Sequence, residues 1–584
     1  MLSALNKPMN GLDKPSIREQ LHCAFSHFQQ NQFIESETIS RNILAHAPDQ
    51  FDALHLLGLV KFQTKDYENA LTFLSKARTL NPLNIQLLNT LACTYQAIGK
   101  TIESEKLFIE ILNINPFYQE TLNNYLNLLE NNSKYYQIIN IFEPKTSHFP
   151  DNTRFLRSLA YSYGVTGNFG LAIATINQAI SRNPGARNSE LLNTKGAILS
   201  ANQQYEKACQ LFQQILISDP SHLNATINLA YALLKRGEIK SAEKHFLTSL
   251  DLLKNLKSSH FTNKTLSAKI QFMLASIRLM HGDYKEGWLN YAKRPSILLQ
   301  KHLTPTENIN LPADLNGKRI LIIHDQGIGD EIFFLRFIPM LKYRGAHISY
   351  LASTKIATLI SRNPDLDEVI ITTNTMHHDY KFSVADLPLL LKCYSAKNIP
   401  VAFKLVPNEK EIASCRKELL QQAKGPLIGI TWRAGANKVQ GQDAIDILDK
   451  QIPLESLVKC FANTAATLVV LQRNPDREEI DYLKNTLNHK IVDYSHYNED
   501  LEQMTALLSI LDDYIGVSNT NMHLRGSLDQ KATLLLPYPP EWRWQLKGDK
   551  TPWYAKFTLL RQDNKGGWTD AINTCKQKLD KVYA

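Results

Sequence analysis

Prolines recur at a fixed interval through the first third of the chain, and this interval is the strongest constraint on the fold. The spacing is 34 residues at first and 36 at the last step, through Pro48, Pro82, Pro116, Pro150, Pro184 and Pro220. Small residues recur in phase, with Gly58, Ala70 and Ala77 before Pro82. A period of about 20–50 residues is typical of repeat architectures. The sequence therefore predicts an array of similar units.

Both the period and the small residues resemble the tetratricopeptide repeat, a helix–turn–helix unit. Small residues let two helices approach closely, and proline ends the second helix because it interrupts the hydrogen-bond ladder. We expect a flexible N-terminus at 1–16 and an array of about eight such units at 17–299. The unit at 119–150 is degenerate, with Leu126 where a small residue is usual.

Arrays of this kind stack into a superhelix whose concave groove binds an extended peptide or another protein. Asparagines such as Asn89, Asn123 and Asn124 either hold the peptide backbone in that groove or are ordinary solvated residues of a helix surface. The pattern predicts a protein or peptide partner for the array. Repeats alone do not define an enzyme.

From about residue 318 the pattern changes to short β-branched runs that alternate with helix-like segments. Such alternation predicts parallel sheets covered by helices on both faces. An irregular stretch separates a first half, 300–407, from a second half, 408–584. The predicted fold class is therefore α + α/β, a repeat superhelix followed by two Rossmann-like domains.

Ligands of open parallel sheets bind beyond the carboxyl ends of the strands. After the first strand comes "QGIGDEI", which contains Gln326, Gly327, Gly329 and Asp330. The segment is not a Walker loop, because no GKS or GKT follows it. It is also a poor dinucleotide-binding fingerprint, because it lacks the third glycine. The segment is either a helix start, where carboxylates suit the positive end, or a loop in which Asp330 accepts a proton from an attacking hydroxyl.

Polar residues also follow strands of the second half. Ser518, Asn519, Thr520 and Asn521 precede a helix-like segment and offer side chains and N–H groups to a diphosphate. The other candidates for charge-assisted bonds or nucleotide contacts are His523, Arg525, Arg433, Gln472 and Arg473. Each group also has an interpretation without a ligand. The segment before the helix would only cap it, with His523 packed inside, and Arg433 would stack on Trp432. Trp542, Trp544, Trp553 and Tyr554 either pack between the halves or stack on a ligand.

Composition excludes several classes of protein. The net charge of +9 is mild for 584 residues and no block of like charges occurs, which argues against a nucleic-acid partner. The seven cysteines are scattered without metal-ligand spacing, which favours a reducing compartment. No signal peptide or apolar run of about 18 residues is present, so we expect no membrane span and a cytoplasmic location.

Seven segments in order carry a second resemblance: "QGIGDEIFFLRFIP", "GITWRAG", "VVLQR", "DLEQMTALLSILDDYIGVSNTNMHLRGSL", "LLLPYPPEWRWQ", "TPWYAKFTLLRQ" and "GGWTDAI". They are similar to the C-terminal module of bacterial tetratricopeptide-repeat glycosyltransferases, akin to the heptosyltransferase family of GT-B fold. The segment 282–294, "GDYKEGWLNYAKR", resembles the linker before that module.

This resemblance implies an inverting transfer of a sugar from a nucleotide-sugar donor without a metal ion or other cofactor. It makes Asp330 the base and the second half the donor side. The heptosyltransferase pattern has an Asp-Thr pair before the histidine, and this chain has Ser518 and Asn519 there. We therefore expect a glycosyltransferase acting on a protein or another acceptor presented by the array. The alternative is a scaffold or adaptor with a degenerate, non-catalytic module.

Overall fold

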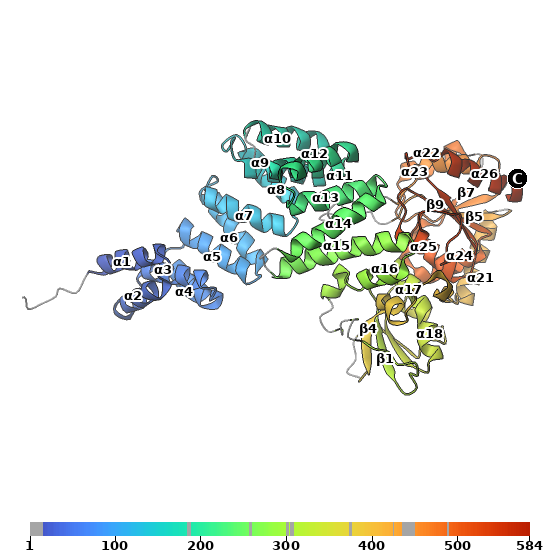
Figure 1. Ribbon diagram of the computed structural model, residues 1–584, viewed down its shortest axis with the longest axis horizontal. Coiled ribbons are helices and arrows are strands. Elements are labelled where there is room, and N and C mark those ends of the chain that lie inside the picture. The colour runs from blue at the N-terminus through green and yellow to red at the C-terminus, as the bar shows by residue number, and fades with distance from the viewer. Residues whose placement is uncertain are drawn as a thin grey trace, which may run out of the picture. The chain divides into compact units, whose positions relative to one another are not determined.

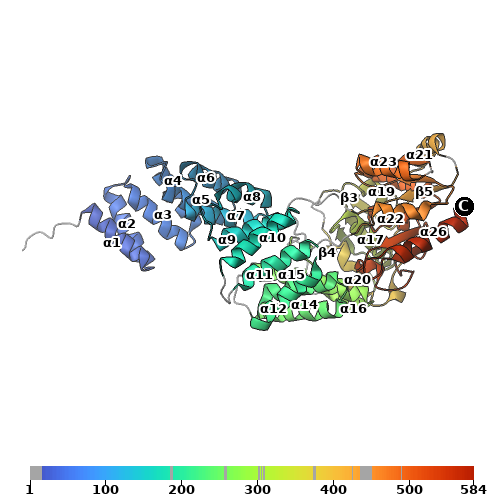
Figure 2. The same ribbon diagram turned by 90° about the horizontal axis from the view of Figure 1, so that it is seen from above.

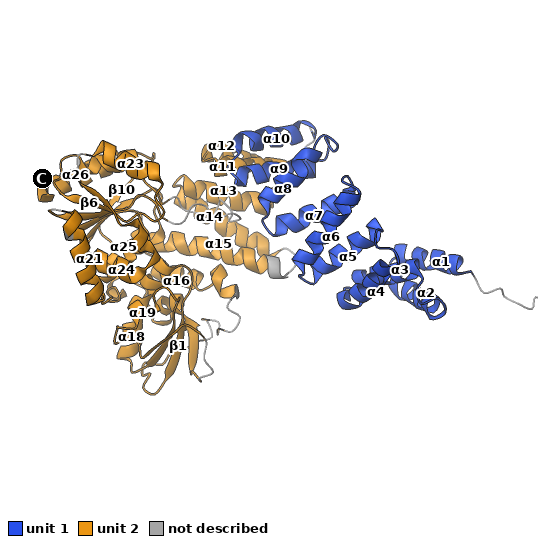
Figure 3. Ribbon diagram, turned by 180° about the vertical axis from the view of Figure 1, so that it is seen from behind, with its two compact units in different colours: residues 1–185 blue, residues 186–584 orange. Residues whose placement is uncertain are grey.

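The computed structural model describes residues 16–183, 188–255, 260–299, 303, 306, 309–372, 377–423, 425–434, 450–487 and 490–583. The chain divides into two units, residues 1–185 and residues 186–584 (Figure 3). Residues 1–15, nearly all of the expected flexible N-terminus, lie outside the described residues. None of the helices in the described ranges is long and apolar enough to cross a membrane.

The first unit consists of helices that pair into hairpins (Figure 2). Its described elements are α1 (Ile17–Gln29), α2 (Phe33–His46), α3 (Phe51–Gln63), α4 (Tyr67–Leu80), α5 (Ile85–Ala97), α6 (Thr101–Ile114), α7 (Gln119–Asn131), α8 (Tyr135–Phe142), the 3-10 turn η1 (Glu143–Lys145), α9 (Thr153–Val165) and α10 (Phe169–Ser181). Each helix packs against the next one along the chain. The prediction of stacked helical hairpins is confirmed.

The turn inside each hairpin repeats with the same period as the prolines. Asn31, Lys65, Gly99, Ser133 and Gly167 have φ angles of 59°, 62°, 79°, 54° and 86°. Successive positions lie 34 residues apart and share the left-handed conformation. Only two of the five are glycine, although glycine tolerates this conformation best. The conformation of the repeat is therefore more regular than its sequence.

Small residues inside the hairpins permit close helix packing. A Cβ atom at Gly58 of α3 would overlap the side chain of Leu74 of α4, so only glycine fits at that crossing. Ala70 and Ala77 on α4 are buried. In the degenerate unit, α8 has only 8 residues and passes into η1, which contains Pro144. Leu126 is buried there, and the hairpin still packs on its neighbours.

The second unit begins with further hairpins (Figure 1). The helices are α11 (Ser189–Ala201), α12 (Tyr205–Ser218), α13 (Leu223–Lys235), α14 (Ile239–Lys254), α15 (His260–Met280) and α16 (Tyr284–Tyr291), followed by the 3-10 turn η2 (Pro295–Leu299). Each packs against the next helix along the chain. The last hairpin is longer, because α15 has 21 residues.

A four-stranded parallel sheet follows, with the strand order β3-β2-β1-β4. Its strands are β1 (Arg319–Ile323), β2 (His347–Leu351), β3 (Glu368–Ile370) and β4 (Tyr380–Ser383). In register, Arg319 of β1 faces His347 of β2, and Ile320 faces Tyr380 of β4. Around this sheet lie α17 (Ile328–Phe334), η4 (Leu335–Phe337), α18 (Ile338–Tyr343), α19 (Ala357–Ile360), η5 (Val384–Asp386), α20 (Leu387–Leu390) and η6 (Ala396–Asn398). We call this sheet with its helices the N-lobe.

A six-stranded parallel sheet forms the C-lobe, with the order β10-β9-β8-β5-β6-β7. Its strands are β5 (Leu427–Ile430), β6 (Thr467–Val470), β7 (Ile491–Asp493), β8 (Asp513–Gly516), β9 (Ala532–Leu536) and β10 (Phe557–Arg561). Its helices and turns are α21 (Glu409–Gln422), α22 (Leu454–Leu457), η7 (Val458–Phe461), α23 (Arg477–Thr486), η8 (Ser495–Glu499), α24 (Leu501–Ile510), α25 (Thr520–Ser527), η9 (Trp542–Trp544) and α26 (Thr569–Tyr583). The α + α/β fold class is confirmed.

The C-lobe sheet is covered on both faces, as parallel sheets require. Helices α22, α23 and α26 lie on one face, with α21, α24 and α25 on the other (Figures 1 and 3). On the first face, Ile428 and Ile430 of β5 pack with Leu483 of α23 and Ile572 of α26.

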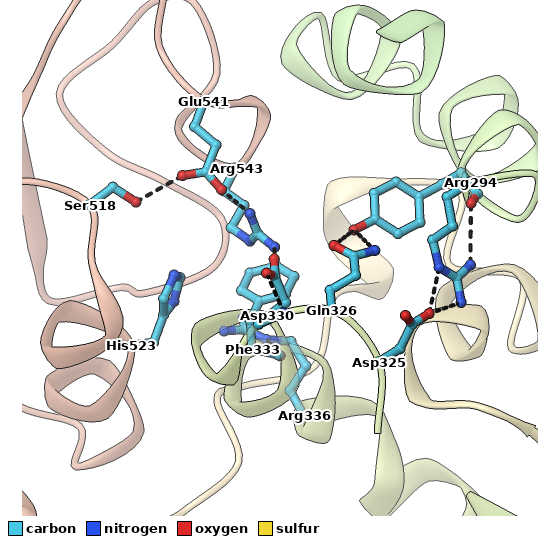
Figure 4. Close-up of polar contacts among 12 residues, drawn as sticks. Arg294, Asp325, Gln326, Asp330, Phe333, Arg336, Ser518, His523, Glu541 and Arg543 are labelled. Carbon is cyan, nitrogen blue, oxygen red and sulfur yellow. Dashed lines mark hydrogen bonds and ion pairs between the residues drawn. The ribbon is translucent and has the colours of Figure 1, made fainter. Parts of the chain in front are cut away.

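The last hairpin is joined to the N-lobe by buried polar contacts. Trp288 of α16 donates its indole N–H to the carbonyl of Cys393 at 3.0 Å. Arg294 donates to Asp325 and Asp386 at 2.7 Å each, and to Ser383 at 2.8 Å. Asp325 directly precedes residues 326–329, which we call the glycine loop. These contacts therefore hold the last hairpin and the glycine loop together (Figure 4).

Candidate functional site

The candidate site lies where the carboxyl ends of the two sheets meet. In the N-lobe, the chain leaves β1 for the glycine loop at the point where β2 and β4 lie on opposite sides of β1. In the C-lobe, β5 and β8 are neighbours although β6 and β7 come between them in the chain. These are topological switch points, where open parallel sheets bind ligands.

Gly329 lies close to the C-lobe at this site. A Cβ atom there would come within 3.1 Å of Cδ2 of His523 and 3.7 Å of Oγ1 of Thr520, both on α25. Gln326 at the start of the loop has a φ of +62°, and its side chain bonds the hydroxyl of Tyr291. The loop is therefore shaped from both sides, by the last hairpin and by α25.

A cavity of about 240 Å³ lies between the glycine loop and the C-lobe. Its lining residues are Gly327, Ile328, Gly329, Asp330, Arg433, Ala434, Lys450, Leu471, Arg473, Asn498, Ser518, Asn519, Thr520, Asn521, His523, Glu541 and Arg543. Small-molecule sites more often enclose about 300–1,000 Å³. The described cavity is therefore smaller than most small-molecule sites.

A chain of charged side chains crosses the cavity (Figure 4). Arg543 donates to Asp330 of the N-lobe through Nη2 and to Glu541 of its own loop through Nη1. Glu541 also accepts a hydrogen bond from Oγ of Ser518 at 2.9 Å and pairs with Nζ of Lys450 at 2.9 Å. Two cations and two carboxylates thus neutralise one another inside the site.

Arg543 is held in place by aromatic rings. Its guanidinium carbon lies 4.3 Å from the ring centroid of Trp542 and 4.6 Å from that of Phe333. Its side chain is 3% exposed, and its Nε has no hydrogen-bond partner among the described residues. A buried cation between aromatic faces gains cation–π attraction that water would otherwise screen. Of the two roles considered for Trp542, packing between the halves and stacking on a ligand, the structure therefore shows packing.

The amino end of α25 also points into the cavity. Asn519 caps this helix, because its Oδ1 accepts from the N–H of Met522 at 3.0 Å. The same side chain donates to Oγ1 of Thr431 at 3.0 Å. The first N–H groups of a helix have no intrahelical acceptor, and Thr520 and Asn521, which carry two of them, line the cavity. Negative charge is favoured at such a helix end.

His523 is a neutral hydrogen-bonding group in this site. Its pKa is lowered well below its ordinary value, first by burial and then by the positive charges of Arg543, Lys450 and Arg336. Nδ1 lies 2.9 Å from the hydroxyl of Tyr554, and Cδ2 and Nε2 lie on the ring edge that faces Gly329.

Replacing His523 with glutamine is expected to flatten the fall of stability in acid. In the unfolded chain a histidine titrates near about pH 6.5. Because the folded pKa is lower, the unfolded chain binds more protons below that pH, so His523 makes stability fall as the pH drops. Thermal unfolding between pH 7.5 and 5 should show a smaller decrease for His523→Gln than for the wild type. The exposed His496→Gln is the control, and equal slopes for His523→Gln and wild type contradict the assignment.

Most of the residues predicted from sequence line the cavity, namely Gly327, Gly329, Asp330, Arg433, Arg473, Ser518, Asn519, Thr520, Asn521 and His523. Arg433 is also engaged elsewhere, since it pairs with Glu479 at 2.6 Å. Arg473 is exposed at the edge of the cavity. The glycine loop and the start of α25, far apart in sequence, are thus brought together.

Three predicted residues do not line the cavity. Gln472 is buried and accepts from the backbone N–H groups of Trp432 and Arg433 at 3.0 Å each, so it shapes the loop after β5. Arg525 is buried and donates to the backbone carbonyls of Leu508, Leu511 and Lys531, on the side of α25 that faces the lobe interior. Gln326 bonds Tyr291 instead.

Sequence reasoning missed Lys450, Asn498, Glu541 and Arg543, which also line the cavity. Glu541 and Arg543 belong to "PPEWRWQ". The prediction for this segment concerned its tryptophans and not the charged residues beside them. A glutamate and an arginine interleaved with tryptophans in a short loop were the available signal. Lys450 follows residues 435–449, which lie outside the described ranges, and no motif marks it.

Comparison with known proteins identifies the repeats directly. The family model of the tetratricopeptide repeat matches residues 51–82 and 199–252. Protein FlbA of Caulobacter vibrioides is 26% identical over 448 residues, which cover 72% of this chain and 71% of that protein. The peroxisomal targeting signal receptor of Kluyveromyces lactis is 28% identical over 214 residues, 35% of this chain and 36% of that receptor.

Two solved structures resemble different parts of the chain. A tetratricopeptide repeat protein from Parabacteroides merdae is 17% identical with a TM-score of 0.36, covering 43% of this chain and 96% of that one. A glycosyl transferase family 9 protein from Veillonella parvula is 12% identical with a TM-score of 0.34, covering 47% of this chain and 96% of that one. We draw no function from either likeness.

Proposed function

We propose that this protein is a glycosyltransferase that transfers a sugar from a nucleotide-sugar donor to a protein, or another bulky acceptor, bound by its tetratricopeptide repeats. One observation carries this proposal. The carboxylate of Asp330 lines the same cavity as the amino end of α25 and the cations Lys450 and Arg543. An acid on one lobe thus faces an anion-binding surface on the other, as an inverting transfer requires.

In the proposed reaction, the acceptor hydroxyl oxygen bonds to the anomeric carbon of the sugar. The bond from that carbon to the diphosphate oxygen breaks, and its electron pair leaves with the nucleoside diphosphate. Asp330 takes the hydroxyl proton. Arg543, Lys450 and the N–H groups of Thr520 and Asn521 stabilise the charge that develops on the departing diphosphate.

The position of the last repeats supports a role in acceptor binding. Within the second unit, Tyr538 of the C-lobe donates to the carbonyl of Gly237 between α13 and α14 at 3.4 Å. Gln545, two residues after Arg543, donates to the hydroxyl of Tyr284 of α16 at 3.1 Å. An acceptor bound along these hairpins would therefore reach the loop that carries Arg543.

A second candidate function is an adaptor whose transferase-like lobes are not catalytic. Two observations favour it. Ser518 and Asn519 occupy the positions of the Asp-Thr pair of the heptosyltransferase pattern. Asp330 is already paired with Arg543, so the carboxylate proposed as the base is engaged with a cation. In this alternative the repeats bind a protein partner and the cavity performs no chemistry.

Calorimetric titration of the full chain with a panel of nucleotide sugars, followed by assay of nucleoside diphosphate release, tests the proposal. We expect one donor to bind, inorganic pyrophosphate to compete with it, and the donor to be hydrolysed slowly when water replaces the acceptor. Binding without any release of nucleoside diphosphate supports the adaptor. If no donor binds, the glycosyltransferase proposal is wrong.

A further inference from the structure

Arg543 links the two lobes across the described cavity. Its two donor branches are occupied by carboxylates, Asp330 from the N-lobe and Glu541 from its own loop. Glu541 in turn forms an ion pair with Lys450 and accepts a hydrogen bond from Ser518. One carboxylate therefore contacts three groups that line the cavity, Arg543, Lys450 and Ser518.

These contacts are the ones that a diphosphate would make. Arginine pairs with carboxylate and with phosphate oxygens through the same planar set of donors. Lysine and serine donate to either kind of oxygen. Glu541 thus fills the described site with an anion that belongs to the protein, in the place where a phosphate oxygen of a ligand would accept the same hydrogen bonds.

We propose that Glu541 is an internal counter-ion that the diphosphate of the donor displaces from Arg543 and Lys450, and that Arg543 is the catalytic cation of the departing diphosphate. This inference rests on the proposed function and adds to it an order of events. While Arg543 holds Asp330, the base is occupied. Once the diphosphate takes Nη1 from Glu541 and then Nη2 from Asp330, the Asp330 carboxylate is free to accept the proton of the acceptor hydroxyl.

The surroundings of Arg543 decide which partner moves. Its guanidinium is fixed between the rings of Trp542 and Phe333, and its side chain is buried. The unpartnered Nε keeps one further donor available within the site. The side chain of Asp330, in the first turn of α17, is 28% exposed, and that of Glu541 is 9% exposed, against 3% for Arg543. The two carboxylates therefore have more room to move than the guanidinium between them.

Replacing Glu541 with glutamine tests the inference, with inorganic pyrophosphate as the probe. The substitution keeps the size of the side chain and an acceptor for Ser518, but removes the charge that competes with pyrophosphate. We expect the dissociation constant of pyrophosphate to fall by about tenfold, because charge-assisted pairs no longer have to be broken. The control is Glu478→Gln, an exposed acid on α23, for which unchanged affinity is expected.

An unchanged or weaker affinity of Glu541→Gln overturns the inference, as does the absence of pyrophosphate binding to both proteins. A second measurement needs no variant. In wild-type crystals soaked with pyrophosphate, the Glu541–Arg543 pair should be broken and Nη1 of Arg543 should contact a phosphate oxygen. Pyrophosphate bound beside an intact pair also overturns the inference.

Failure of the inference and failure of the proposed function are distinguishable. If the wild type transfers sugar but Glu541→Gln leaves pyrophosphate affinity unchanged, the counter-ion role is wrong and the glycosyltransferase proposal stands. If no nucleotide sugar is turned over but Glu541→Gln binds pyrophosphate more tightly, the counter-ion role stands and the glycosyltransferase proposal is wrong.

Discussion

Asp330→Asn is expected to lower the rate of sugar transfer by about 10²–10⁴-fold, the range that general-base catalysis contributes. Asparagine has nearly the same shape, and its single oxygen can keep one of the two hydrogen bonds that the oxygens of Asp330 accept, the one from Arg543 or the one from the N–H of Gly327. It has no basic carboxylate to take the hydroxyl proton. Donor binding should persist or become tighter, because Arg543 loses one of its two carboxylate partners.

The measurement combines steady-state transfer rates with donor titration on the same preparation. Asp570→Asn, at an exposed position on α26, is the matched control and should transfer sugar at the wild-type rate. Two results would contradict the role of Asp330. One is turnover by Asp330→Asn within about twofold of wild type, well below the range for a general base. The other is a loss of transfer explained entirely by a loss of donor binding.

Arg294→Ala is expected to destabilise the second unit by about 3–5 kcal/mol, the usual cost of removing one partner from a buried ion pair. The side chains of Arg294 and Asp325 are each 1% exposed, and that of Asp386 is 2% exposed. Without the guanidinium, two carboxylates remain buried with no opposing charge. Urea unfolding followed by tryptophan fluorescence reports on this region, because Trp288 lies on the same hairpin.

Arg416→Ala removes an arginine from the exposed face of α21 and should change the free energy of unfolding little. The combined variant Arg294→Met, Asp325→Asn, Asp386→Asn should recover part of the loss, since it leaves no buried charge. If Arg294→Ala costs no more than Arg416→Ala, the buried ion pair does not hold the hairpin to the N-lobe.

The repeat architecture follows from sequence, because local interactions determine it. Proline cannot continue the hydrogen-bond ladder of a helix interior, and the small residues Gly58 and Ala70 permit close packing of neighbouring helices. The alternation of strands and helices in the lobes is equally local. Strand β4 is an exception, because its four residues, Tyr380–Ser383, do not form a distinct apolar run and no local pattern marks it.

The candidate site was predicted in part. Asp330 and the start of α25 were found because residues after strands meet at the carboxyl edges of parallel sheets. Arg525 was included because it follows the same helix start, but it lies on the inner face of α25 and bonds backbone carbonyls. Position along a helix is visible in sequence, whereas the direction of a particular face depends on what packs against it.

By itself, the sequence determined the helical hairpins, the parallel sheets and the edge at which polar residues gather, since each depends on neighbours along the chain or on strand polarity. Only the tertiary structure decided which charges meet. Arg543 reaches Asp330 across 213 residues of sequence, and Glu541 reaches Lys450 from another loop. Such pairs form because two folded lobes close on one another and bury cations that need partners, and no local pattern records that encounter.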